Sequence, residues 1–281
     1  MRPDPLTRIG LVVQRAIALA EASLERLVAV QFVDRAVALG SLGFTALVPL
    51  LVISAAFVPG TDGLANTLIE RFHLSGSTAD LVRQVFAQPD DVRQSLSWLG
   101  LVLLIASALS FTRALQRVYE HAWQLPARGW RGTRAGLVWL GGIVVWTTIF
   151  ATARRWLLDV TGSGGALVVL LGGNALLWLW TPWTLLAQRI AWLQLLPTAL
   201  LTAIAMSGWS IGSAIYMPTA IEDSAAHYGT IGVAIALVSW LVAAGFVLVA
   251  CAAVGAVLGK ELVAPKERAQ DVPRPVEPRI P

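Results

Sequence analysis

The stretch TIGVAIALVSWLVAAGFVLVACAAVGAVL, residues 230–258, decides the fold because it contains no Asp, Glu, Lys or Arg. The hydrocarbon core of a bilayer is about 30 Å thick, and about 20 apolar residues of α-helix are enough to cross it. A charge-free run of this length therefore predicts a membrane-spanning helix.

Five more apolar runs of this kind precede it. A β-barrel, the other way to satisfy backbone hydrogen bonds in lipid, uses alternating segments of about ten residues, and these runs are about twice as long. The sequence thus predicts an all-α integral membrane protein with a six-helix bundle. The expected spans are residues 36–58, 95–113, 135–153, 166–187, 195–216 and 230–258.

The composition of the 281 residues agrees with this fold class. Hydrophobic residues make up 56% and charged residues 14%, whereas soluble domains contain about 25% charged residues. A soluble fold lacks the polar surface to cover so much apolar material, so soluble enzymes and disordered chains are excluded. The single cysteine, Cys251, allows no intrachain disulfide and is expected to be a packing residue.

The distribution of Lys and Arg predicts the orientation. Sixteen of the 21 fall in segments that share one side if both termini are cytoplasmic, which follows the positive-inside rule. The net charge of +4 is then mainly a topology signal, and no nucleic-acid partner is expected. We predict a multi-pass protein of the bacterial inner (cytoplasmic) membrane.

Three regions lie outside the spans. Residues 1–35 form a cytoplasmic segment with an amphipathic helix, which either lies on the membrane surface or packs against the inner ends of the bundle. Residues 59–94 form an outer loop, in which residues 77–80 have the spacing of a helix start. Residues 259–281 are rich in proline and charge, so a disordered cytoplasmic tail is expected.

The sequence offers little material for catalysis. The three histidines lie in different segments without metal-binding spacing, and the six span cores contain no acidic residue. We expect no enzyme activity, no cofactor and no metal.

Proline and small residues affect the spans. Pro49 and Pro182 each remove a helical hydrogen bond, and the kinks either line a transport pathway or are purely structural. Small residues four apart predict close helix packing. These pairs are Gly208 with Gly212, Gly255 with Gly259, and Ser41 with Thr45.

Polar residues at the inner end of the second span are candidate head-group ligands. Arg113, Gln116, Arg117 and Glu120 recur at helical spacing along one face. Guanidinium groups at this depth suit an anionic lipid head group, although interfacial anchoring with an Arg117–Glu120 pair is the alternative. On the outer side, the paired residues 154–155, Arg154 and Arg155, are a second possible head-group contact.

Several motifs resemble the YihY/BrkB family of inner-membrane proteins over about residues 30–260. They are FTALVPLL at residues 44–51, the pattern Phe111, Leu115, Gln116, Tyr119 and Trp123, and the start of the last span at Tyr228 and Gly229. The resemblance implies six helices with both termini cytoplasmic, and it adds Tyr228 and Gly229 to the candidate pathway residues.

The resemblance also suggests functions. The family was once labelled ribonuclease BN, and its links to envelope lipids suggest transport of an amphiphile. The sequence departs from the family at residues 251–253, where Cys-Ala-Ala stands in place of Gly-Ala-Glu. A proton-coupled mechanism that uses this glutamate is therefore not implied.

Three functions remain open. The leading hypothesis is a transporter or flippase-like protein for an anionic lipid or other amphiphile in envelope maintenance. The alternative is a non-transporting scaffold of an envelope complex, and a membrane-bound ribonuclease is disfavoured. The expected partners are membrane lipids, and a homo-oligomer or envelope complex is possible within either hypothesis.

Overall fold

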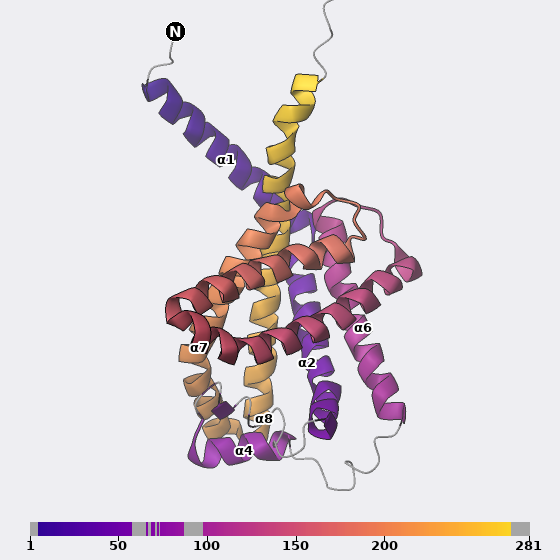
Figure 1. The fold of residues 1–281 in the computed structure, drawn as a ribbon, viewed down its shortest axis with the longest axis vertical. Helices are drawn as coiled ribbons and strands as arrows, with labels where there is room; N and C mark the ends of the chain where they lie inside the picture. Colours follow the sequence, from indigo (N-terminus) through magenta and orange to yellow (C-terminus); the bar gives the residue numbers. More distant parts are fainter. Residues whose placement is uncertain are drawn as a thin grey trace, which may run out of the picture.

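The computed structural model describes residues 5–57, 66, 69–70, 72, 74–86 and 98–270. In these ranges all regular secondary structure is helical, and no strand occurs, which confirms the predicted all-α class. The helices, shown in Figure 1, are α1 (Pro5–Ala29), α2 (Phe32–Phe57), α4 (Gly76–Phe86), α6 (Trp98–Ala122), the 3-10 helix η1 (Gly129–Gly132), α7 (Thr133–Leu185) and α8 (Trp192–Gln270).

The long helix α8 folds back on itself at Gly229. Gly229 has φ 58° and ψ −136°, a backbone conformation available essentially only to glycine. Beyond Gly229 the chain runs back along the first arm of α8. A hydrogen bond from Trp240 Nε1 to Ser213 Oγ at 2.7 Å, across the two arms, shows this. The predicted fifth and sixth spans are therefore contained in the two antiparallel arms of α8.

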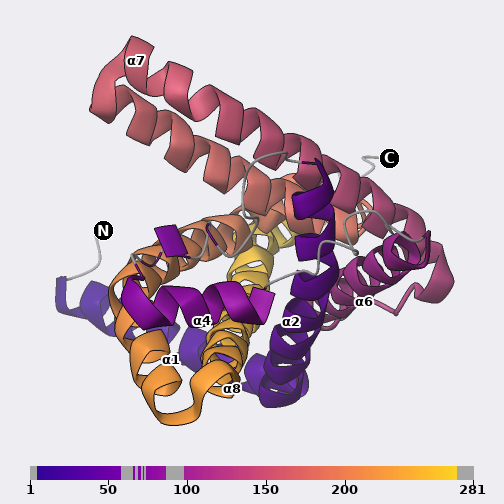
Figure 2. The same cartoon turned by 90° about the horizontal axis from the view of Figure 1, so that it is seen from below.

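Helix α7 is also a hairpin. Trp139 Nε1 donates to Thr181 Oγ1 at 3.2 Å although the two residues are 42 positions apart. A straight helix would separate them by about 63 Å at 1.5 Å per residue. Figures 1 and 2 show the two arms of α7 lying side by side and running across the direction of α2, α6 and α8. The regions predicted as the third and fourth spans therefore do not run alongside the other helices.

Close approach of α2 to the second arm of α8 forms the centre of the molecule. A Cβ added at Gly40 would meet the backbone of Val242, and one at Gly245 would meet the carbonyl of Ala36. The two backbones therefore touch, and buried Leu39 and Val249 belong to the apolar cluster at this level. A second cluster lies at the opposite end, where α4 packs through Ala79 and Val82 against the turn of α8.

The prediction of close packing at small residues is confirmed for one of the three pairs. Ser41 and Thr45 are both exposed, so this pair does not form a close helix contact. Gly255 and Gly259 lie against Thr198 and Gln194 of the first arm of α8. In contrast, nothing lies within 4 Å of a Cβ added at Gly208 or Gly212. That pair is on an outward face of α8, so spacing alone did not reveal which side of the helix is covered.

The N-terminal helix and the end of α8 pack together. Helix α1 meets α2 with a bend of 58° after Ala29. Arg15 of α1 pairs with Glu261 of α8 at 3.5 Å, and Lys260 donates to Gln124 Oε1 at 2.6 Å. Helix α8 continues to Gln270, whereas the composition predicts a disordered tail from residue 259. The rest of the predicted tail, 271–281, lies outside the described residues.

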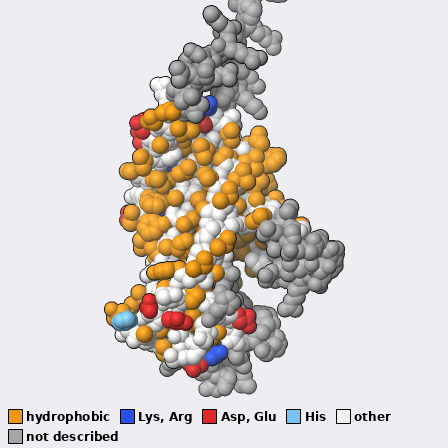
Figure 3. Space-filling view, turned by 90° about the vertical axis from the view of Figure 1, so that its left-hand side faces the viewer, with side chains coloured by type: hydrophobic (Ala, Val, Ile, Leu, Met, Phe, Trp, Pro, Cys, Tyr) orange, Lys and Arg blue, Asp and Glu red, His pale blue; other side chains and the backbone are white. Residues whose placement is uncertain are grey.

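The exposed surface is apolar over a wide area. Figure 3 shows hydrophobic side chains over the middle of one face, with charged side chains mainly toward the two ends. Ile204 and Ile215, for example, are 71% and 75% exposed. Soluble monomers rarely expose apolar patches of such extent, which gives the molecule a membrane-like character.

By length and composition, fewer of the described helices qualify as membrane spans than the six predicted. One stretch, Trp192–Leu262, is long and apolar enough to cross a membrane, and the bent pair Val13–Ala29 with Phe32–Ala46 satisfies the same criteria jointly. The six-span count therefore stays a prediction.

Candidate functional site

The C-terminal end of α6 carries a row of buried polar side chains. Thr112, Gln116 and Glu120 are four residues apart, so they lie along one helix face, and all three are buried. Arg117 points to solvent instead, and Arg113 is partly buried. The four residues predicted to form one strip thus divide between an inward and an outward face.

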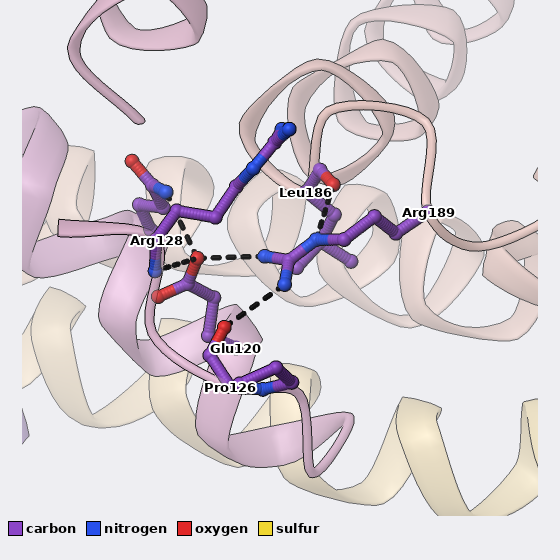
Figure 4. Close-up of polar contacts among 6 residues, drawn as sticks. Glu120, Pro126, Arg128, Leu186 and Arg189 are labelled. Atoms are coloured by element: carbon purple, nitrogen blue, oxygen red, sulfur yellow. Dashed lines mark hydrogen bonds and ion pairs between the residues drawn. The ribbon is translucent and has the colours of Figure 1, made fainter. Parts of the chain in front are cut away.

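Glu120 is the centre of the inward face. Its Oε1 accepts hydrogen bonds from Arg189 at 2.7 Å, from Gln116 Nε2 at 2.9 Å and from the Arg128 backbone N–H at 3.4 Å. Figure 4 shows these donors converging on one carboxylate oxygen. The Glu120 side chain is 3% exposed, so its charge depends on this pairing with Arg189.

Arg189 is held by the connection between α7 and α8. Besides Glu120, its guanidinium donates to the carbonyl oxygens of Leu186 at 3.0 Å and Pro126 at 2.9 Å. Ala187 and Gln188, which precede it, both have positive φ, and each such non-glycine residue costs about 1–2 kcal/mol. The turn is therefore strained locally, and the contacts of Arg189 help to offset the strain.

Sequence reasoning missed the partnership of Arg189. The alternative it considered for Glu120 was a pair with Arg117, but the ion pair is formed with Arg189. One signal was available, since Arg189 is the only charged residue between Asp159 and Glu222. A lone charge in so apolar a region requires a partner.

Glycines allow α6 and the start of α7 to approach closely. The side chain of Gln116 lies directly against Gly132, where a Cβ would collide with its amide group. One turn further, Gly136 lies against Thr112. Arg113 donates to Thr133 Oγ1 at 2.9 Å, which ties the outward side of α6 to the same helix start.

Two arginines and a histidine gather on the outward side, and we call Arg35, Arg117 and His121 the cationic cluster. Partial burial and the nearby charge of Arg117 both lower the pKa of Arg35. Burial lowers the pKa of His121 most, Arg35 and Arg117 lower it further, and Glu120 acts in the opposite direction. The three groups are therefore close enough for their positive charges to repel one another.

The other predicted residues lie elsewhere. Pro182 is buried in the last turn of α7, next to Thr181. Tyr228 is exposed and Gly229 forms the turn of α8, at the end opposite the cationic cluster (Figure 1). Pro49 lies in α2, while Arg154 and Arg155 lie in α7, and the side chains of these three are outside the described residues.

A search for metal-binding groups among the described side chains finds no cluster of three or more His, Cys, Asp or Glu residues. The described side chains that face outward at this end of α6 include a guanidinium and an imidazole, those of Arg117 and His121, whose protonated forms attract anions. The inward Glu120–Arg189 pair holds this surface in place.

Comparison with models of known protein families matches residues 23–275 to the one described as "Virulence factor BrkB". The match covers nearly the whole chain. Comparison with curated proteins and with solved structures gives no significant match.

Proposed function

The chain belongs to the virulence factor BrkB family, and from this premise we propose that it is a multi-pass inner-membrane protein that transports an anionic lipid or amphiphile. In this proposal six segments cross the membrane and both termini are cytoplasmic. Two crossings are assigned to the arms of α8 and one each to α2 and α6. The remaining two require the arms of α7 to align with these helices in the membrane instead of running across them.

The observation that carries the proposal is the position of the cationic cluster beside the apolar surface. Val102, Leu103 and Ile105 of α6 are exposed apolar residues, and Arg117 and His121 follow them on the same helix. A phosphate or carboxylate at this position would meet guanidinium groups, while attached acyl chains would meet apolar side chains. This combination suits an amphiphile better than a small hydrophilic ion.

Arg117 is the residue we propose as the main head-group ligand. Its guanidinium is exposed, and the planar fork of donors matches two oxygens of a phosphate. Arg35 supplies a second positive charge from the start of α2, although its Nε already donates to the Val30 carbonyl at 2.6 Å. Pro49 and Pro182 are proposed to shape the path through the bundle, and no catalytic step, metal or cofactor is invoked.

The alternative function is a non-transporting scaffold. The observation that favours it is tight packing in two places. Glu120, Arg189 and Gln116 are joined at the C-terminal end of α6, and Gly40 touches Val242 at the centre of the molecule. A scaffold needs such rigidity, whereas transport needs helices that separate.

A vesicle assay separates the two functions. The full chain is reconstituted with a fluorescent anionic phospholipid, and the rate at which the lipid changes leaflet is measured. We expect the wild type to accelerate this movement and Arg117→Gln to reduce the rate severalfold. Arg128→Gln is the matched control, since Arg128 is an exposed arginine at the same end but outside the cationic cluster.

The outcomes are distinct. Wild-type protein that leaves the exchange rate unchanged would contradict transport and favour the scaffold. Equal loss of rate in Arg117→Gln and Arg128→Gln would show that general positive charge matters, rather than the cationic cluster.

A further inference from the structure

A polar groove lies between α1 and the end of α8. It has a volume of about 330 Å³ and is lined by Glu25 and Arg26 of α1, Gln124 after α6, and Lys260 and Glu261 of α8. Small residues such as Ala22 and Ala29 leave this space open. Lys260 lies two residues after the apolar run that ends at residue 258, so the groove lies at the level proposed for the inner membrane surface.

The groove contains an unsatisfied buried donor. The Nε of Arg26 is buried and has no hydrogen-bond partner among the described residues. A buried donor without an acceptor costs about 1–3 kcal/mol. A ligand in the groove would remove this cost if the Arg26 side chain turned its Nε toward the groove, and the most suitable acceptor for a guanidinium is an anionic oxygen.

Lys260 points to the same ligand chemistry. Its ammonium group donates a hydrogen bond to Gln124 Oε1 at 2.6 Å, which fixes the group at the groove. Burial and the positive charge of Arg26 lower the pKa of Lys260, so the two cations lie close together. An anion bound between them would relieve their repulsion.

Two carboxylates complete the groove. Glu25 is exposed and lies next to Arg26 in the sequence, while Glu261 makes an exposed ion pair with Arg15 at 3.5 Å. The four charged residues of the lining, Glu25, Arg26, Lys260 and Glu261, sum to zero. A lining that is neutral overall but has separated positive and negative groups suits a zwitterion better than a simple anion.

We propose that this groove binds a phosphate–amine head group, with the phosphate held by Arg26 and Lys260 and the amine held by Glu25. The source of the head group is either a zwitterionic phospholipid or the corresponding soluble phosphate ester. This site is separate from the cationic cluster. It rests on the membrane placement given under the proposed function, but it does not require transport.

The test uses the full chain in detergent and measures binding by titration calorimetry. The probes are short-chain phosphatidylethanolamine, short-chain phosphatidylglycerol and phosphoethanolamine. We expect the wild type to prefer phosphatidylethanolamine. Arg26→Gln should lower the affinity for both lipids at least about tenfold, because a charge-assisted hydrogen bond is lost. Glu25→Gln should lower the affinity for phosphatidylethanolamine alone.

Two controls and a second variant keep the test decisive. Glu21→Gln changes an exposed carboxylate one turn earlier on α1, and Arg83→Gln removes an exposed arginine at the opposite end of the molecule, so both should bind like the wild type. If Arg26→Gln fails to fold, Lys260→Gln serves in its place, since Lys260 is exposed.

Each result has a defined meaning. Phosphoethanolamine that binds as tightly as the lipid assigns the site to the soluble ester, and weaker binding assigns it to the lipid. Unchanged affinity of Arg26→Gln and Lys260→Gln for every probe overturns the site. If lipid binding is lost in Arg117→Gln but not in these variants, the groove is refuted and the proposed function stands.

Discussion

Glu120 is a buried carboxylate whose charge is balanced mainly by one residue from another part of the chain. Arg189 lies 69 positions away and is 22% exposed, whereas Glu120 is 3% exposed. A buried ion pair adds little net stability, but removing one partner leaves the other charge uncompensated. The pair therefore makes the junction of α6, α7 and α8 sensitive to single substitutions.

We expect Arg189→Ala to lower the free energy of unfolding by about 3 kcal/mol, the lower end for breaking a buried pair because Arg189 is partly exposed. The double variant Arg189→Ala with Glu120→Gln should lose less, since no charge is then buried. Denaturation in detergent by increasing SDS measures both. A loss below about 0.5 kcal/mol in Arg189→Ala would contradict this account of Glu120.

The lowered pKa of His121 predicts how the stability of the protein depends on pH. Its pKa is below the usual value near 6.5, first because of burial and then because of Arg35 and Arg117, with Glu120 opposing. The folded state therefore favours neutral His121, while the unfolded chain takes up the proton more readily. The contribution of His121 to the stability of the protein is fully present above pH 6.5. It is lost as the pH falls through the pKa that His121 has in the folded state.

The measurement is the melting temperature between pH 7.5 and pH 5.5. We expect His121→Gln to reduce the fall in melting temperature on acidification, because this residue no longer takes up a proton. His227→Gln is the matched control, since His227 is an exposed histidine two residues before the turn of α8 at Gly229. Identical pH profiles for wild type and His121→Gln would remove the case for repulsion within the cationic cluster.

The contact between α2 and α8 requires glycine at residue 40 but not at residue 43, one turn later. A Cβ at Gly40 would meet the backbone of Val242, which cannot move away without shifting α8. At Gly43 the nearest atom would be a side-chain carbon of Phe111 at 3.7 Å, an ordinary contact. The two glycines therefore provide a matched pair on one helix.

We expect Gly40→Ala to destabilise the protein by about 1–3 kcal/mol, as overpacking does. Gly43→Ala should be neutral or stabilising by up to about 1 kcal/mol, because alanine favours the helix and meets no obstacle. Thermal unfolding in detergent compares the two. Equal effects would mean that α2 and α8 do not touch at Gly40.

At the level of elements, the sequence predicts the helices well but not how they lie. Charge-free runs place α2, much of α6 and both arms of α8, and the spacing at residues 77–80 predicts α4. The crosswise course of α7 and the outward face of Gly208 depend on contacts between distant segments, which periodicity does not contain. The ion pair between Arg189 and Glu120 likewise depends on a contact between distant segments.

For the molecule as a whole, both sets of basic side chains proposed to bind head groups lie at the end that holds α1 and the end of α8. The cationic cluster is on α2 and α6, and the groove with Arg26 and Lys260 is on α1 and α8. The opposite end carries α4 and the turn at Gly229 (Figure 1). This polarity is expected of a protein whose inner surface faces anionic lipids.

Labelling of single cysteines tests this orientation. In a Cys251→Ala background, a membrane-impermeant maleimide added to spheroplasts should label Asp80→Cys and Glu222→Cys but not Glu21→Cys, since the first two lie near α4 and the turn of α8. Arg154→Cys decides the course of α7. Six crossings require its labelling from outside, and protection there, with labelling only after lysis, would reduce the count to four because the hairpin of α7 would not cross.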